Sequence, residues 1–134
     1  MSTGIDLRLS GGARAAFAAR HALDPLAHDL EPDLHENVRL LVSELVTNSI
    51  RHSGVRRRGS IELRVTVTDR WVRVEVCDPG PGFEARVSIP TVGQTDGWGL
   101  FLVEQIADRW GVRGGDLTCV WFELKRRRRS QGRG

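Results

Sequence analysis

Residues 60–78, SIELRVTVTDRWVRVEVCD, alternate apolar and polar side chains on either side of Asp69-Arg70. A period of two is typical of a β-strand with one buried face, so Ser60–Thr68 is predicted to be one strand. The valines of 72–76 repeat the pattern after the polar link, and the two runs together predict an antiparallel hairpin. Continuing the alternation places Asp78 on the buried face as well.

Outside this hairpin, apolar spacing predicts three helices and two further strands. Residues 79–96 are rich in proline and glycine and show no periodicity, which indicates a long loop. Because helices and antiparallel strands are intermixed, the fold class is predicted as α/β, a two-layer sandwich whose mainly antiparallel sheet has helices on one face. The predicted elements are a strand over 5–9, a helix over 13–30 interrupted or ended near Pro25, and a helix from 31 to about 52. They continue with a helix over 97–111 and a strand over 117–124.

Charge is unevenly distributed along the 134 residues, which contain 20 Lys and Arg against 17 Asp and Glu. Residues 125–134 hold six of the cations and no acid, so residues 1–124 carry a net charge of −3. We therefore predict one folded domain over 1–124 and a basic, disordered tail over 125–134. Attraction of the tail to nucleic acid is the less favoured interpretation.

The cysteines and the apolar runs bear on the compartment. No apolar run approaches the roughly 18 residues needed to span a bilayer, and the first ten residues lack the order of a signal peptide, which predicts a cytoplasmic protein. Cys77 and Cys119 show no metal-ligand spacing and are expected to be reduced, inert thiols. The alternation of side chains places both cysteines, with Trp71 and Trp121, on the sheet face away from the helices. The four residues are expected to form an apolar patch, which is either a partner or homodimer surface or is covered by a terminal segment.

Three polar motifs interrupt these apolar elements. The first is Glu44, Asn48 and His52, which share one edge of the second predicted helix. An Asn carbonyl suits Mg²⁺, and a carboxylate one turn away can orient or deprotonate a hydroxyl beside bound phosphates. The alternative is a solvated helix edge with a local hydrogen bond.

The other two motifs contain glycines. In Asp78-Pro-Gly80-Pro-Gly82, a buried aspartate needs hydrogen-bond donors, which the amino group of adenine can supply, and the glycines permit close approach of a flat ligand. The same sequence is also consistent with a plain turn. Gly97-Trp-Gly99 opens a helix whose unpaired N–H groups suit an anion, or it is a hinge.

These motifs, in this order, resemble the N, G1 and G2 boxes of the GHKL (Bergerat-fold) ATPase superfamily. The resemblance covers about residues 5–124 and is closest to the anti-sigma-factor serine kinases and the related small histidine-kinase-like ATPases of actinobacteria. Leu40-Leu-Val-Ser-Glu-Leu-Val-Thr-Asn48 and Ala107-Asp-Arg-Trp-Gly111 are similar to segments of those proteins. The resemblance implies a Bergerat ATP-binding fold with ATP and Mg²⁺ as ligands.

The resemblance also implies a role for each matching residue. Glu44 is the implied catalytic base and Asn48 the implied metal ligand. The implied nucleotide-binding residues are Asn48, Arg51 at the phosphates, Asp78 as the adenine anchor with Thr118 completing that site, Gly80 and Gly82 in the G1 turn, and Gly97, Gly99 and Leu100 in the G2 segment.

The implied function is phosphorylation of a serine on an anti-sigma-factor antagonist in a partner-switching circuit. The implied partners are a sigma factor and the antagonist, with a homodimer as a further possibility and neither membrane nor nucleic acid expected. The alternative is a noncatalytic, nucleotide-dependent protein-binding module of the same fold.

Overall fold

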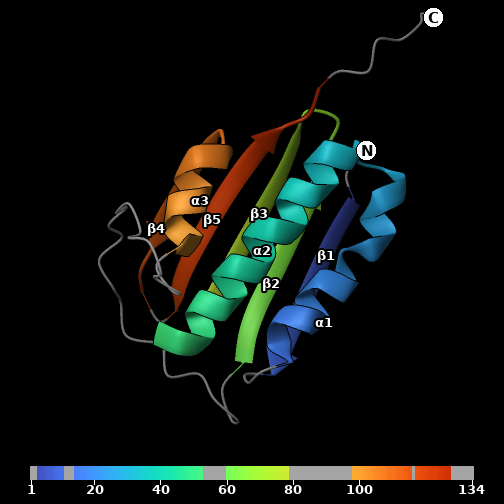
Figure 1. Cartoon of the computed structure of the whole chain (residues 1–134). Coiled ribbons are helices and arrows are strands. Elements are labelled where there is room, and N and C mark those ends of the chain that lie inside the picture. Colours follow the sequence, from blue (N-terminus) through green and yellow to red (C-terminus); the bar gives the residue numbers. More distant parts are fainter. Residues whose placement is uncertain (1–2, 11–13, 53–59, 79–97, 116, 128–134) are drawn as a thin grey trace, which may run out of the picture.

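The computed structural model describes residues 3–10, 14–52, 60–78, 98–115 and 117–127. Within these ranges the helices lie together on one side of a five-stranded sheet (Figure 1). The elements in chain order are β1 (Thr3–Ser10), α1 (Ala15–Ala22), the 3-10 helix η1 (Asp24–His28), α2 (Pro32–His52), β2 (Ser60–Val67), β3 (Trp71–Asp78), α3 (Trp98–Ile106), β4 (Arg109–Arg113) and β5 (Thr118–Lys125).

The sheet has the order β1-β2-β3-β5-β4, and every neighbouring pair is antiparallel. Strands β2 and β3 form the predicted hairpin, and their inward side chains are buried as the alternation indicated. Apolar residues of α2, such as Val38 and Leu41, fill the space between helix and sheet opposite Phe122, and all three are fully buried. The two-layer α/β sandwich predicted from the sequence is confirmed.

Helix α2 begins at Pro32 and ends at His52, as predicted. Proline fits the first helical position because its missing N–H has no partner there in any helix, and Asp33 in the first turn faces the positive end of the helix dipole. In the described part of the chain, no helix combines the length and the hydropathy needed to cross a membrane.

The helix predicted over 13–30 is interrupted near Pro25, as expected, although its α-helical part already ends at Ala22. A 3-10 helix follows, with Pro25 in its first turn. Proline lacks the backbone donor that an α-helix requires, so the chain tightens at this point. Leu23 and Leu26 stay buried on both sides of the change.

The third predicted helix also ends early, because residues 109–113 form the edge strand β4 rather than the last helical turn. Gly111 pairs with Trp121 of β5. A Cβ atom on Gly111 would lie 2.9 Å from the Trp121 indole nitrogen, so only glycine lets the ring cross this position. The helix predicted over 97–111 is therefore wrong over residues 107–111.

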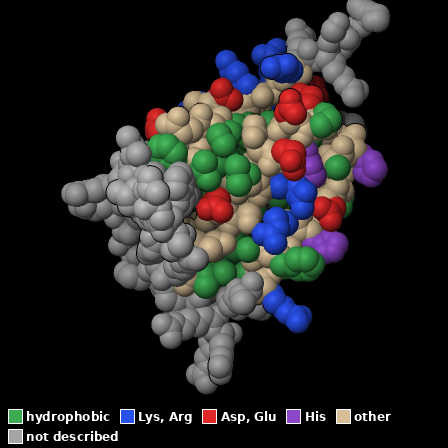
Figure 2. Space-filling model, viewed as in Figure 1, with side chains coloured by type: hydrophobic (Ala, Val, Ile, Leu, Met, Phe, Trp, Pro, Cys, Tyr) green, Lys and Arg blue, Asp and Glu red, His purple; other side chains and the backbone are tan. Residues whose placement is uncertain are grey.

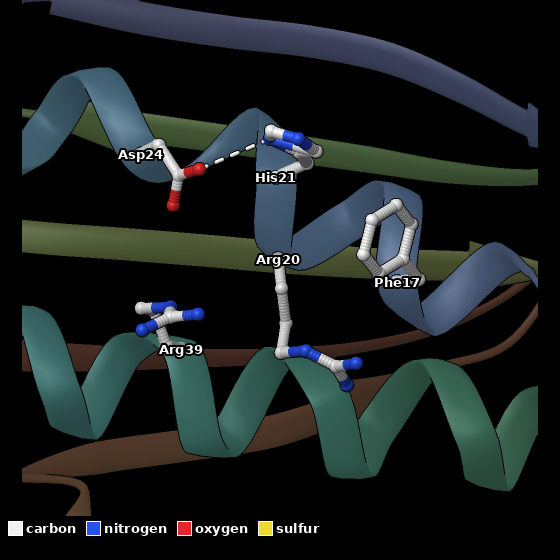
Figure 3. Close-up of a pocket in the computed structure, with 5 residues that line it drawn as sticks. All are labelled: Phe17, Arg20, His21, Asp24 and Arg39. Atoms are coloured by element: carbon white, nitrogen blue, oxygen red, sulfur yellow. Dashed lines mark ion pairs between the residues drawn. The ribbon is translucent and has the colours of Figure 1, made fainter.

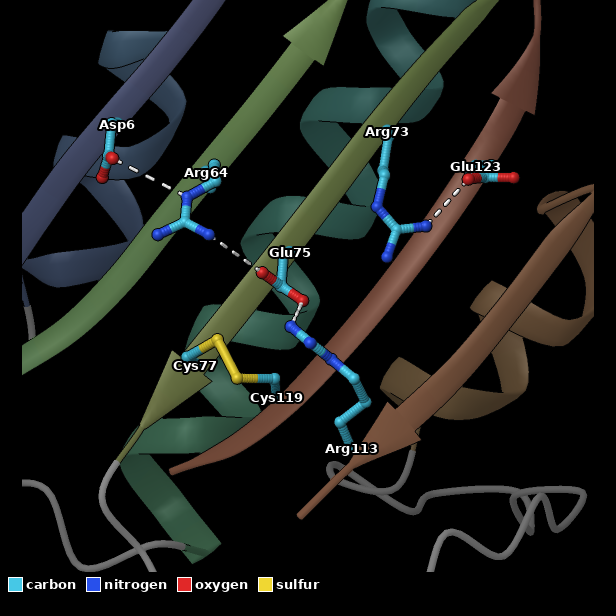
Figure 4. Close-up of polar contacts among 8 residues, drawn as sticks. All are labelled: Asp6, Arg64, Arg73, Glu75, Cys77, Arg113, Cys119 and Glu123. Carbon is cyan, nitrogen blue, oxygen red and sulfur yellow. Dashed lines mark hydrogen bonds and ion pairs between the residues drawn. A yellow bond between two sulfur atoms is a disulfide. The ribbon is translucent and has the colours of Figure 1, made fainter. Parts of the chain in front are cut away.

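The expectation of two free thiols is contradicted, because Cys77 and Cys119 form a disulfide between β3 and β5 (Figure 4). The two residues are direct partners in the strand register, with Cα atoms 4.0 Å apart. Their predicted outward parity is correct, and this shared face is what lets the sulfurs meet. Neither side chain is more than 8% exposed.

The two tryptophans of the predicted outer patch lie beside cations. The Arg73 guanidinium lies 4.4 Å from the centre of the Trp121 ring and donates a 2.8 Å hydrogen bond to Glu123. Lys125 lies 5.9 Å from the Trp71 ring. Cations therefore cap both indole rings, which makes this surface less apolar than its aromatic content indicated.

Two residues of the predicted tail belong to the fold, because β5 runs to Lys125 and Arg126 is held by the body of the domain. The Arg126 backbone N–H donates to the Arg70 carbonyl at 2.7 Å. Its guanidinium donates to the carbonyls of Thr68 and Asp29 and to the Glu31 carboxylate at 3.2 Å. Arg126 thus joins the β2–β3 turn to the chain that enters α2, while residues 128–134 lie outside the described residues.

Glu31→Gln is expected to lower the free energy of unfolding by about 1 kcal/mol at pH 7. Burial alone would raise the pKa of Glu31, but hydrogen bonds from the backbone and from Arg126, with the Arg126 charge, outweigh burial and lower the pKa below its ordinary value of 4.5. A lowered carboxylate pKa stabilises the fold above the ordinary pKa and ceases to do so as the pH falls through the lowered value.

Urea unfolding of wild type and Glu31→Gln between neutral pH and acid measures this difference. The gap between the two proteins should close as the pH falls below 4.5. The control is Asp69→Asn, which removes an exposed carboxylate from the neighbouring turn. A Glu31→Gln effect that is the same at all pH values would contradict the assignment.

Candidate nucleotide-binding site

The C-terminal end of α2, the end of β3 and the start of β5 lie at one edge of the molecule, the lower edge of Figure 1. Strand β3 ends at Asp78 and β5 begins at Thr118, and these two residues are paired in the register. Helix α2 packs against β3 and α3. Because β4 is antiparallel to β5 and directly follows α3, the N-terminal end of α3 is the end that points toward this edge.

Asp78 and Thr118 are both buried, with 5% and 3% of their surface exposed. They face the helix layer, because their inward parity is shared by Val76 and Val120, which belong to the core. A carboxylate and a hydroxyl are thereby held side by side on the last rung of the β3–β5 ladder. The sequence predicted both residues and their common face, but not that they are direct partners.

Helix α2 carries Glu44 and Asn48 one turn apart in its C-terminal half, and both are partly exposed. Their neighbours Leu45 and Val46 are buried in the core, which fixes the rotation of the helix about its axis. Arg51 lies in the last turn of the same helix. The helix thus presents a carboxylate and an amide along one edge, as the sequence predicted.

Helix α3 begins at Trp98, so Gly99 lies in its first turn and Leu100 follows, 7% exposed and part of the core. Gly80, Gly82 and Gly97 lie outside the described residues. The structure therefore brings two of the predicted site residues, Asp78 and Thr118, directly together. The remaining described site residues lie on the helices that cover the sheet: Glu44, Asn48 and Arg51 on α2, and Gly99 and Leu100 on α3.

The residues at this edge fit a nucleotide in their chemistry. The Asp78 carboxylate can accept a hydrogen bond from the amino group of adenine, and the Thr118 hydroxyl can donate to or accept from the ring edge. An Asn carbonyl and a Glu carboxylate are oxygen donors of the kind that Mg²⁺ uses beside phosphates.

Sequence reasoning missed the disulfide that adjoins this pair. Cys77 precedes Asp78, and Cys119 follows Thr118. Once Asp78 and Thr118 are both assigned to the inner face of neighbouring strands, the two cysteines must both lie on the outer face. Each is one residue further into its strand than its neighbour in the pair. The dipeptides Cys77-Asp78 and Thr118-Cys119 could have indicated the disulfide. It was missed because the two cysteines are 42 residues apart in the sequence.

A hollow of about 320 Å³ lies between α1 and α2 and contains none of the predicted site residues (Figure 3). His21 forms an ion pair with Asp24 at 3.0 Å, and Arg20 donates to the Ser43 hydroxyl at 2.7 Å. Charges of both signs are interspersed over the helix-side face among the coloured residues of Figure 2. The lining of this hollow is Phe17, Arg20, His21, Asp24 and Arg39.

The fold and the paired residues define a small ATPase-type domain. The family described as histidine kinase-like ATPase domain matches residues 12–124, and the chain belongs to this family. The match spans every element from α1 to the last residues of β5. The GHKL resemblance drawn from the three sequence motifs is thereby confirmed.

Within this family the chain is similar to proteins named anti-sigma F factor. It is 37% identical over 82 residues to the one from Clostridium acetobutylicum and 35% identical over 82 residues to the one from Caldanaerobacter subterraneus subsp. tengcongensis. Each match covers 60% of this chain and 57% of the relative, so the chain spans little more than half the length of either relative.

A solved structure shares the fold. The histidine kinase domain of the blue-light activated histidine kinase from Erythrobacter litoralis EL346 superposes with a TM-score of 0.55 at 22% identity. The superposition covers 86% of this chain and 65% of that chain. At this identity the likeness supports the architecture and says nothing of substrate.

Proposed function

We propose that this protein is a Mg-ATP-binding anti-sigma factor and serine protein kinase that phosphorylates an anti-sigma-factor antagonist in a partner-switching circuit. The observation that carries the proposal is the buried Asp78–Thr118 pair at the end of the β3–β5 ladder, within a chain of the histidine kinase-like ATPase family. The two relatives named anti-sigma F factor supply the regulatory context. The cytoplasm is the proposed location.

In this proposal each side chain has a distinct task. Asp78 and Thr118 bind and orient the adenine, and their burial excludes competing water. Asn48 holds Mg²⁺, which when bound neutralises phosphate charge. Glu44, one helical turn from Asn48, accepts the proton of the attacking serine hydroxyl. The phosphates are contacted by Arg51 and by the first turn of α3 with Gly97 and Gly99. Gly80 and Gly82 let the backbone approach the adenine base.

Asn48→Ala is expected to remove most of the Mg²⁺ dependence of ATP affinity, which in wild type should be about tenfold. The amide carbonyl is the proposed protein ligand, so its loss should leave binding without metal little changed. Calorimetric titration of ATP with Mg²⁺ and with a chelator measures both values. Asn37→Ala, an amide deletion at the other end of α2, is the matched control.

Equal Mg²⁺ enhancement in wild type, Asn48→Ala and Asn37→Ala would remove Asn48 from the metal site. Absence of ATP and ADP binding by wild type at millimolar concentration would overturn the proposed function as a whole.

A noncatalytic, nucleotide-dependent protein-binding module is the second candidate. It is favoured by the composition of residues 83–96, which contain Arg86 as their sole Lys or Arg, so few cations are available there to grip the γ-phosphate. The proposed partners, a sigma factor and the antagonist, are the same for both candidates, as is a homodimer. The two candidates differ in whether phosphate is transferred.

A further inference from the structure

We infer that Cys77 and Cys119 form a thiol–disulfide site that controls nucleotide affinity, with the oxidised form holding the adenine pair in its binding geometry. The inference rests on the proposed nucleotide site and adds a mode of regulation to it. The structural basis is one juxtaposition: the disulfide closes the rung next to Asp78 and Thr118 in the β3–β5 ladder.

The disulfide is placed where a covalent link has most effect on that pair. Asp78 is the last residue of β3 and Thr118 the first of β5, so among the described residues their rung has ladder neighbours on one side only. The end of a ladder opens more readily than its middle. A covalent bond at Cys77–Cys119, one rung inside, restricts the separation of the two strand ends and hence the spacing of the carboxylate and the hydroxyl.

Reduction should loosen this end without unfolding the sheet, because ion pairs of Glu75, two rungs further in, hold β3 to other strands. Glu75 is 7% exposed and accepts hydrogen bonds from Arg113 of β4 and from Arg64 of β2, the latter at 3.5 Å (Figure 4). These ion pairs cross the outer face from β2 to β4 beside the disulfide. The reduced chain therefore keeps its register, and the loss is confined to the last rung.

The chemistry requires a dithiol reductant, which supplies two electrons and two protons. One reductant thiolate attacks a cysteine sulfur, breaks the Cys77–Cys119 bond and forms a mixed disulfide. The second reductant thiol displaces this bond, and the products are two cysteine thiols and a cyclic reductant disulfide. In the proposed cytoplasmic location disulfides are usually transient and redox-sensing, which favours a switch over a permanent clamp.

A metal site is the competing interpretation of the same atoms. A Glu75 carboxylate oxygen and the two sulfurs lie within 4.8 Å of one another. The carboxylate already accepts from two guanidinium groups, and a cation at this position would have to displace both of them. Zinc titration of the reduced protein is therefore expected to show no binding above that of a Cys77→Ala/Cys119→Ala variant.

The experiment compares ATP and ADP affinity by calorimetry for wild type, oxidised and then reduced with dithiothreitol. Reduction should weaken affinity about fivefold, the order of effect expected when a preorganised site is loosened. Cys77→Ala/Cys119→Ala should bind like the reduced wild type and ignore the reductant. Leu26→Ala, which is destabilised in η1 far from the site and retains both cysteines, should still respond to reduction.

Hydrogen exchange provides a readout that does not depend on nucleotide. On reduction, the amides of residues 76–78 and 118–120 should exchange faster, while those at the β2–β3 turn end of β3 should not change. Unchanged affinity and unchanged exchange on reduction, with both thiols titrated, would overturn the inference and leave the proposed function intact. Failure of the oxidised wild type to bind nucleotide would overturn the function and the coupling together.

Discussion

Glu44→Gln is expected to lower phosphoryl transfer about a hundredfold or more while ATP affinity stays within a few-fold of wild type. Glutamine keeps the size and shape of the side chain but cannot serve as a base, because an amide does not take up a proton near neutral pH. Glu44 lies one helical turn from Asn48 on α2, where it can reach a hydroxyl beside the phosphates without touching adenine. Binding and chemistry should therefore respond separately.

The measurement is labelled-phosphate transfer at saturating ATP to the antagonist recovered with the protein from its native cells. Glu36→Gln is the matched control, because it removes an exposed carboxylate two turns earlier on the same helix. Tight binding of ATP and partner by wild type without any transfer would favour the binding module. Equal rates in wild type and Glu44→Gln would keep the kinase and exclude Glu44 as its base.

Loss of the disulfide is expected to lower the free energy of unfolding by about 3 kcal/mol. The bond joins residues 42 positions apart, and the closed loop contains α3 and β4, so its removal gives the unfolded chain much more freedom. Urea unfolding with and without dithiothreitol measures the difference. The Cys77→Ala/Cys119→Ala variant is the control and should show one midpoint under both conditions.

Coincident wild-type transitions in the two conditions, together with two free thiols before any reductant is added, would contradict the disulfide. The loss of unfolding free energy and the proposed loss of nucleotide affinity are separate quantities. Unfolding depends on the whole domain, whereas the proposed change in affinity depends on the spacing of Asp78 and Thr118 at the end of one ladder.

Much of the fold could be predicted because its central strands have one buried and one solvated face. The alternation on either side of Asp69-Arg70 predicted the hairpin and the inward position of Asp78, and the structure agrees. The same reasoning placed Thr118 inward. Helix α2 was predictable at both ends, because Pro32 and Asp33 mark its start and Ser53-Gly54 follows its last residue, His52.

The parts that could not be predicted depend on contacts between distant segments. Strand β4 contains a glycine and continues the apolar spacing of α3, and it is a strand because it pairs with β5, where the Trp121 ring lies across Gly111. Glu75 has the parity of an exposed residue, yet Arg64 and Arg113 from two other strands cover it. Arg126 belongs to a basic run in the sequence but finds its partners at Asp29, Glu31 and Thr68.

The central claim is that Asp78 anchors adenine at the end of the β3–β5 ladder, and one titration tests it directly. Wild type and Asp78→Asn are each titrated with ATP, ADP and GTP in the presence of Mg²⁺ by calorimetry. We expect wild type to bind both adenine nucleotides and to discriminate against GTP, and Asp78→Asn to lose about tenfold or more in ATP affinity together with most of that discrimination. Equal ATP affinity and equal selectivity in the two proteins would contradict the account.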